Sequence, residues 1–192
     1  MEAKLNEYLR EGEHIRWQSK PENFQLLESS SKTQILRKWV LTLAICGGLI
    51  ISYLSAHERS NSLGFVSLMT FCAAVMLISP MMEKRGLMKS RYWITDRRVI
   101  QMTKDKVFYY MNLSDVDKYE IVKGLTDNDC LVVGSPVFAD VEKHIRWRAS
   151  HPKEDPEALK DRDHVDGMIL YNIGNAAAGA ALLKELGRTK AA

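Results

Sequence analysis

Two long runs of apolar residues, separated by six polar residues, dominate the pattern of hydrophobic positions along the chain. The first run covers residues 39–56 and contains no charged residue in 18 positions, and the second covers residues 63–82 and contains none in 20. As α-helices these runs would be about 27 and 30 Å long, close to the thickness of the hydrocarbon core of a bilayer. The pattern therefore predicts two transmembrane helices rather than a buried helical hairpin of a soluble protein.

The loop between the runs, 57–62, is so short that the two helices must run antiparallel as a hairpin. Within the loop the charge of Arg59 is countered by Glu58. Basic residues gather instead outside the runs, at Lys32, Arg37 and Lys38 before the first and between Lys84 and Arg98 after the second. Lys and Arg flank membrane helices on the cytoplasmic side. We therefore expect an integral cell-membrane protein with two spans and both termini in the cytoplasm.

The hairpin divides the chain into an N-terminal cytoplasmic arm (1–38), the transmembrane segment (39–82) and a cytoplasmic domain (83–192). In the arm, the spacing of Leu5, Tyr8 and Leu9 predicts a short helix. Alternation of apolar and polar residues around Ile15 and Trp17 predicts a strand over 13–19. A single strand is not stable alone, so it should join a sheet of the cytoplasmic domain. Residues 28–38 should lead into the first span as a helix.

The cytoplasmic domain is rich in the β-branched and aromatic residues that favour strands. Turn residues at Thr95 and Asp96 split its first strand-like segment into two strands. Further strands are predicted within 106–113, 118–124, 130–136, 141–150 and 167–173, with a polar excursion over 151–164.

The chain closes with a predicted amphipathic helix that Asn175 caps and Gly187 ends. Its apolar face should contain Ala177, Ala181, Leu182 and Leu186. Strands followed by one helix predict an α+β protein in which a small antiparallel barrel or sandwich is closed by a C-terminal helix.

Charge and cysteine content narrow the function classes. Among the 192 residues, the arm carries 7 basic and 6 acidic residues and the segment 83–192 carries 19 and 17, so charge does not indicate nucleic-acid binding. The three cysteines, Cys46, Cys72 and Cys130, have neither metal-ligand spacing nor a disulfide framework. We expect no cofactor.

Few residues of the sequence suggest a metal-binding or catalytic site. Asp161, Asp163, His164 and Asp166 lie close together, but their spacing does not match a calcium loop and the distal Glu is missing, so an exposed polar loop is the better interpretation. No catalytic serine or cysteine motif and no phosphate-binding glycine loop is present. We therefore expect a protein that is not an enzyme.

The strongest binding candidate is the basic run after the hairpin. Near an anionic leaflet each basic residue contributes about 1 kcal/mol of attraction. The same residues would also set topology without any specific recognition. Specific recognition would require Arg97 and Arg98 to act as a fork on one phosphate. The candidate membrane-surface residues are Lys84, Arg85, Lys89, Arg91, Arg97 and Arg98.

Four features together carry a resemblance to a known family: the early GEHIRWQSKP, the hairpin, RYWITDRRVI, and the terminal MILYNIGN with its helix. The chain resembles the bacterial pleckstrin-homology-like (PH-like) membrane proteins, a family long catalogued as a domain of unknown function. Tyr92, Thr95, Arg97 and Arg98 are the most specific match. The resemblance implies a PH-like fold and a non-enzymatic scaffold, or a lipid- or protein-binding role, and it supplies no catalytic or ligand residues.

Our leading functional hypothesis is a module at the cytoplasmic membrane surface that binds an unidentified protein partner or assembles with copies of itself. A recognition module for anionic lipid headgroups and a subunit of a membrane enzyme complex are the alternatives.

Overall fold

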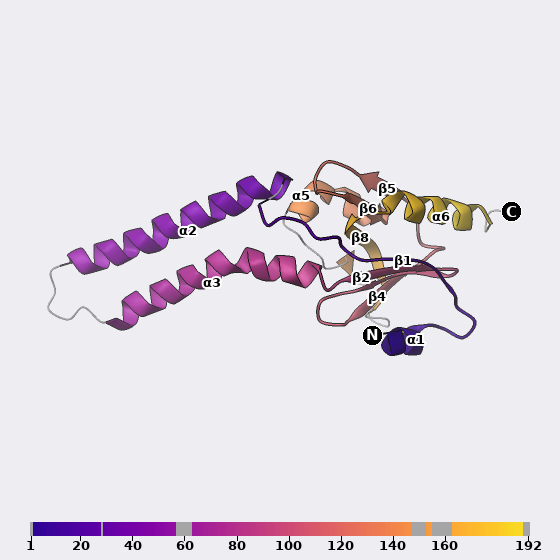
Figure 1. Cartoon of the computed structure of the whole chain (residues 1–192), viewed down its shortest axis with the longest axis horizontal. Helices are drawn as coiled ribbons and strands as arrows, with labels where there is room; N and C mark the ends of the chain where they lie inside the picture. Colours follow the sequence, from indigo (N-terminus) through magenta and orange to yellow (C-terminus); the bar gives the residue numbers. More distant parts are fainter. Residues whose placement is uncertain (1, 28, 57–62, 147–152, 155–162, 190–192) are drawn as a thin grey trace. The chain divides into compact units, whose positions relative to one another are not determined.

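The computed structural model describes residues 2–27, 29–56, 63–146, 153–154 and 163–189 (Figure 1). The chain forms two compact units. The first combines Met1–Phe24 with Gly86–Ala192, and the second is Gln25–Arg85. The chain is a mixture of helices and antiparallel sheets, as the sequence predicts for an α+β protein.

The first sheet of the larger unit joins the N-terminal arm to the segment after the apolar runs. Its strands lie in the order β1 (Ile15–Ser19), β2 (Arg91–Thr95), β3 (Arg98–Met102) and β4 (Phe108–Asn112), each antiparallel to the next. The register pairs Trp17 with Ile94 and Gln18 with Trp93. The prediction that the arm contributes a strand to this sheet is confirmed.

The second sheet is built from the C-terminal half of the chain. Its strands lie in the order β5 (Tyr119–Val122), β6 (Asp129–Val133), β8 (Val165–Ile173) and β7 (Lys153–Glu154). The two sheets meet beside β4, where the backbone N–H of Tyr110 donates to the carbonyl of Asp163 at 2.8 Å. They do not close into a barrel.

The main core lies between the two sheets. Tyr92 and Ile94 contribute from the first sheet, and Leu131 and Leu170 from the second, all of them fully buried. Alternate residues of a strand point to opposite faces, which is why one face of each sheet can supply this core.

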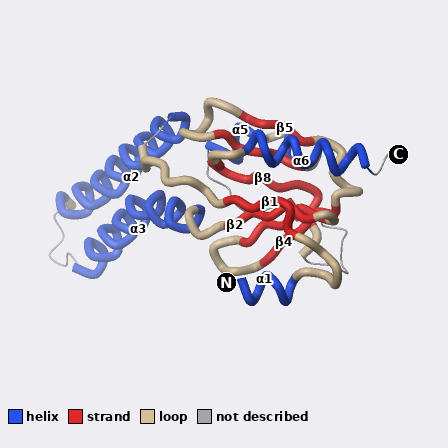
Figure 2. The backbone as a smooth tube through the Cα atoms, turned by 45° about the vertical axis from the view of Figure 1, so that its right-hand side comes forward, coloured by secondary structure: helices blue, strands red, loops and turns tan. Residues whose placement is uncertain are grey.

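The helix α6 (Ala176–Thr189) packs against this core through Ala176 and Leu183. The predicted apolar face is confirmed in part, since Leu182 and Leu186 pack against the core, whereas Ala177 and Ala181 are exposed. The helix also continues past Gly187, where the sequence predicted its end. Figure 2 shows α6 and α1 on opposite sides of the strands.

Short helices cover the outer faces of the sheets. On the first sheet, α1 (Glu2–Tyr8) packs its Leu5 in a cluster with Trp93 and Tyr110. On the second, α4 (Ser135–Phe138) and α5 (Val141–Arg146) contribute to a cluster that also contains Cys130, Phe24 and Leu87.

The predicted strand over 141–150 is wrong where the structure describes it, because residues 141–146 are helical. Val141 and Ile145 are both buried while Lys143 is exposed. Residues four apart share one face of a helix, so this burial fits α5. Residues 147–150 lie outside the described residues.

The second unit consists of α2 (Ser29–Ser55) and α3 (Leu63–Leu87) up to Arg85. The indole Nε1 of Trp39 in α2 donates to the carbonyl of Leu77 in α3 at 3.1 Å, and the ring centres of Tyr53 and Phe65 lie 4.4 Å apart. A residue later in α2 thus contacts a residue earlier in α3. The connecting residues 57–62 lie outside the described residues.

Both helices are long and apolar enough to cross a membrane. The stretches Ser31–Ser55 and Leu63–Leu87 each contain 25 residues, and only 11% and 6% of their most apolar windows are buried. The helix α2 begins in the polar stretch before the first apolar run, so the predicted helical lead-in is confirmed.

Candidate functional site

The structure separates the six basic residues that the sequence groups together. Lys84 and Arg85 lie in the last turn of α3, and Lys89 is exposed in the link from α3 to β2. Arg91 is half-buried at the start of β2. Arg97 is exposed in the turn after β2, whereas Arg98 is buried at the start of β3. The neighbours Arg97 and Arg98 therefore have different environments.

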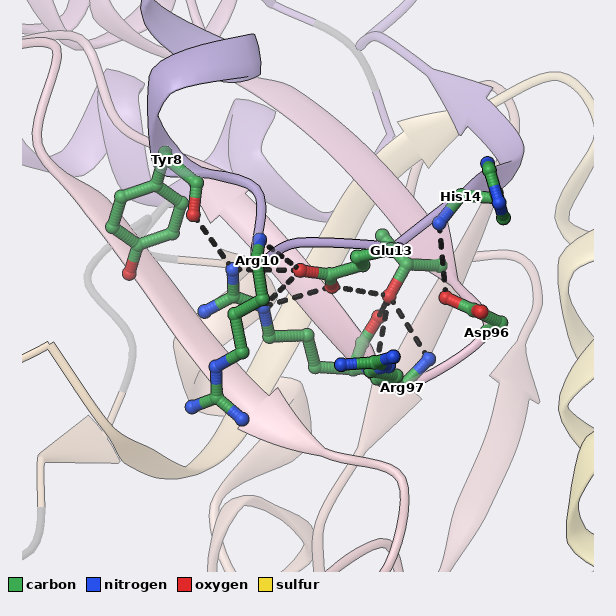
Figure 3. Close-up of polar contacts among 8 residues, drawn as sticks. Tyr8, Arg10, Glu13, His14, Asp96 and Arg97 are labelled. Carbon is green, nitrogen blue, oxygen red and sulfur yellow. Dashed lines mark hydrogen bonds and ion pairs between the residues drawn. The ribbon is translucent and has the colours of Figure 1, made fainter.

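Arg98 forms a buried ion pair with Glu13 of the arm, the residue labelled at the centre of the contacts in Figure 3. Its Nε and Nη2 each donate to the carboxylate at 2.9 Å, and the two side chains are 3% and 0% exposed. The backbone N–H of Arg10 donates to the same carboxylate at 2.8 Å, and the hydroxyl of Thr95 donates to it at 2.7 Å. Both oxygens of the Glu13 carboxylate thus accept hydrogen bonds from groups within the protein.

The guanidinium group of Arg98 is also held from its other sides. Its Nη2 donates to the backbone carbonyl of Tyr8 at 2.7 Å, and its carbon lies 4.9 Å from the ring centres of both Tyr8 and Tyr110. Such cation–π contacts add to the ion pair. Arg98 therefore fastens the arm to the sheet, and its guanidinium is not available to a lipid headgroup.

The environment of Glu13 favours its ionised form. Burial by itself raises the pKa of Glu13, but the hydrogen bonds from Arg98, Arg10 and Thr95, together with the positive charge of Arg98, outweigh it and hold the pKa below its ordinary value. The carboxylate is consequently charged at neutral pH and remains paired.

The other residues of the Tyr-Thr-Arg-Arg pattern also serve the fold. The hydroxyl oxygen of Thr95 accepts the backbone N–H groups of Arg97 and Arg98 at 3.1 and 2.9 Å and so closes the turn between β2 and β3. The hydroxyl of Tyr92 accepts the backbone N–H of Tyr171 at 3.1 Å, which links the two sheets. Burial raises the pKa of Tyr92.

Asn172 fixes the arm at a second place. It has a positive φ of 48° at an irregularity in the β6–β8 pairing. Its Nδ2 donates to the carbonyl of Glu22 at 2.9 Å, and its own carbonyl accepts the N–H of Glu22 at 2.9 Å. Its Oδ1 accepts the backbone N–H of Asn128 at 2.8 Å. The buried amide therefore satisfies backbone groups of two loops.

A groove of about 650 Å³ lies beside α1, β1 and the start of β2. Its apolar lining comes from Leu5, Ile15 and Trp93, and its polar lining comes from Asn6, Gln18, Ser19, Lys20, Glu22 and Arg91. Of the predicted basic residues only Arg91 belongs to it. No motif marks Lys20, which becomes part of a site only because β1 pairs with β2.

The described acidic and histidine residues near the start of β8, from Asp163 onward, do not gather as metal ligands. His164 instead lies 3.1 Å from the carboxylate of Asp115, while Asp161 lies outside the described residues. Burial raises the pKa of Asp115, but hydrogen bonds from Asn112, Ser114 and His164 outweigh it and lower that pKa. Among the described residues no cluster of three or more potential metal ligands is found.

No family model, no curated protein and no solved structure matches this chain.

Proposed function

We propose that this protein is a membrane-anchored, non-enzymatic module with a PH-like fold, which acts as a scaffold at the cytoplasmic membrane surface. One observation carries the anchoring. The helices α2 and α3 each include a stretch of 25 residues that is apolar enough to cross a membrane, with little of its most apolar part buried, and an exposed apolar surface of this extent needs a lipid or protein environment.

The pairing of β1 with β2 supports a protein that crosses the membrane twice. These strands flank the two apolar helices in the sequence and are hydrogen-bonded to each other. They must therefore lie on the same side of any membrane that the helices cross, which requires an even number of crossings. The basic residues beside both helices favour the cytoplasmic side for this unit.

The scaffold role draws its support from how the polar side chains of the larger unit are used. Glu13, Arg98, Thr95 and Asn172 are buried and form hydrogen bonds to other residues of the larger unit. They hold the arm and the sheets together, as a rigid binding platform requires. The partner is a protein or a second copy of this chain.

Membrane insertion and partner binding can be tested together. The full-length protein should resist alkaline extraction from membranes, and reporters placed at Lys32, at Asn61 and after the C-terminus should give cytoplasmic, external and cytoplasmic signals. Crosslinking in intact membranes, followed by purification in mild detergent, should recover a defined protein partner or a homo-oligomer. Extraction by alkali, or a cytoplasmic reporter at Asn61, would contradict the proposed anchoring.

The groove favours a second candidate function, the recognition of anionic lipid headgroups. It combines two cationic side chains, Lys20 and Arg91, with apolar residues in the same unit. A scaffold and a lipid sensor are distinguishable because only the sensor should discriminate anionic from zwitterionic lipids in otherwise identical membranes.

A further inference from the structure

We propose that the groove between α1 and β1 binds one anionic phospholipid, with the phosphate at Lys20 and Arg91 and the adjoining apolar part of the lipid against Ile15 and Trp93. The inference rests on the proposed membrane anchoring and adds a defined site to it.

The polar part of the groove offers hydrogen-bond donors suited to a phosphate. The Nη1 of Arg91 donates to the carbonyls of Met88 at 3.1 Å and Ser90 at 2.8 Å, which fixes the orientation of the guanidinium group. The group carries further N–H donors on Nε and Nη2. Lys20 adds a second positive charge from an exposed side chain. Two cations with several donors complement a phosphodiester.

The acidic member of the groove, Glu22, offsets only one of these two positive charges. Its carboxylate is directed to the backbone of Gly174, so close that a Cβ at Gly174 could not be accommodated. Two positive charges against one negative charge leave the lining with a net charge of +1.

The apolar part of the groove is a wall rather than a deep pocket. Trp93 and Leu5 are 6% and 4% exposed and form its base, whereas Ile15 is 37% exposed. Ile15 pairs with Thr95, whereas Ser19 pairs with Tyr92, so the exposed isoleucine lies at the opposite end of β1 from Lys20 and Arg91. A ligand whose apolar segment extends away from its charged group, as that of a phospholipid does, fits this arrangement.

The place of the groove in the chain also fits a lipid. Leu87, the last residue of α3, and Phe24, the last residue that the arm contributes to the larger unit, lie in the same core cluster of that unit. Lys20 precedes Phe24 by four residues, and Arg91 follows Leu87 by four residues. The cations therefore come from segments directly next to both points where the chain leaves this unit for the apolar helices.

An extended peptide added to the edge of β1 is less favoured. An irregularity in the pairing lies between Ile15 and Trp17, and Lys20 and Pro21 follow the strand directly. Irregular pairing, charged side chains and proline are the features that protect edge strands from pairing with another chain. The free edge is thus unsuited to strand addition, while the groove beside it stays accessible.

The test uses the full-length protein in an uncharged detergent, incubated with equal amounts of phosphatidylglycerol and phosphatidylcholine and analysed by native mass spectrometry. We expect the wild type to retain one phosphatidylglycerol in preference to phosphatidylcholine. Lys20→Gln should weaken this retention about tenfold, because it removes one charge-assisted contact. Ile15→Asp should weaken it at least as much. The matched control is Lys123→Gln, which removes one exposed positive charge outside the groove.

The outcomes separate the possible ligands. Soluble glycerol 3-phosphate that displaces the lipid at equal concentration would show that the site reads the phosphate alone and would overturn the apolar contact. An acidic peptide whose binding depends on Lys20, with lipid retention unchanged, would overturn the inference in favour of a protein ligand. If Lys20→Gln and Lys123→Gln lost phosphatidylglycerol retention equally, the effect would be one of general surface charge, and the inference would also be overturned.

The failure of this inference and that of the proposed anchoring are distinguishable. A protein that resists alkaline extraction but retains lipid equally in wild type and Lys20→Gln would keep its anchor and lose the site. A protein that alkali extracts would lose the anchor itself. Circular dichroism of each variant confirms that its fold is intact.

Discussion

At the scale of single residues, the two adjacent arginines show that an ion-pair partner determines whether a charged side chain can be buried. Arg97 and Arg98 look equivalent in the sequence, yet only Arg98 is buried. Its partner, Glu13, lies 85 positions away in the arm. A buried charge requires such a partner, since leaving it uncompensated costs several kcal/mol. The composition of the basic run could not reveal this difference because the partner comes from another part of the fold.

Replacing one member of the ion pair should destabilise the larger unit strongly. Arg98→Met leaves the Glu13 carboxylate buried without its cation, and we expect a loss of about 3–5 kcal/mol in the free energy of unfolding. The control Arg97→Met removes an exposed charge and should change it by about 0.5 kcal/mol or less. Urea unfolding of the full chain in mild detergent measures both. Equal effects of the two variants would contradict the assigned role of Arg98.

The same pair should make stability depend on acidity. Because the pKa of Glu13 is lower in the folded state, its contribution is present above its unfolded pKa of about 4.3 and is lost as pH falls through the folded value. Thermal unfolding of Glu13→Gln should therefore depend less on pH than that of the wild type below about pH 4.5. The lowered pKa values of Asp115 and Asp117 leave a residual dependence of the same sign in both proteins. Parallel pH profiles would count against the ion pair.

At the scale of elements, local composition predicts the strands well and the helix faces less well. β1, the β2–β3 pair and β8 follow from β-branched and aromatic residues with turn signals between them. Residues 141–146 alternate like a strand, but the same residues also satisfy helical spacing, and burial of Val141 and Ile145 against the second sheet selects the helix. When a short segment fits both the periodicity of a strand and that of a helix, tertiary contacts thus decide which of the two forms.

The groove is an element-scale feature that no single segment encodes. It requires α1, β1 and β2 to meet, and these come from both sides of the apolar runs. Arg91 could be named in advance because it belongs to a visible basic run. Lys20 could not, because its position beside Arg91 depends on the register of β1 against β2.

The contact between α6 and β1 gives a test at the same scale. A Cβ at Gly179 would lie 3.1 Å from Leu131 and 3.3 Å from the ring of Trp17, so these side chains leave little room for a methyl group. Alanine favours a helix over glycine by about 1 kcal/mol. We expect Gly179→Ala to be neutral or destabilising in the wild type but stabilising by up to about 1 kcal/mol in a Trp17→Ala background.

Trp17→Ala alone should cost about 2–3 kcal/mol, since the ring is half-buried against the core. A double-mutant cycle from urea unfolding of the four proteins gives the coupling. Additive effects would show that Trp17 does not limit the space at Gly179, in which case Leu131 alone would set it.

At the scale of the whole molecule, the arm and the segment after the apolar helices form one unit although 61 residues separate them (Gln25–Arg85). The sequence suggested this because an isolated strand needs a sheet. It did not indicate how firmly the arm is held, which follows from the Glu13–Arg98 pair and from the contacts of Asn172 with Glu22. The larger unit can therefore be complete only after both apolar helices have been synthesised.

Removal of the arm should separate the stability of the larger unit from membrane insertion. Deleting residues 2–20 removes β1 and Glu13, so Arg98 loses its partner and Trp17 no longer covers α6. We expect the segment after α3 to become sensitive to protease, while the apolar runs, which are untouched, still resist alkaline extraction from membranes. Deleting residues 2–8 removes α1 and the contacts of Tyr8 with Arg98 but keeps β1 and Glu13, so it should cause a smaller increase in cleavage. Protease resistance that is unchanged by the longer deletion would show that β1 does not complete the sheet, whereas loss of membrane insertion in that variant would show that the arm, and not the apolar runs alone, is needed for anchoring.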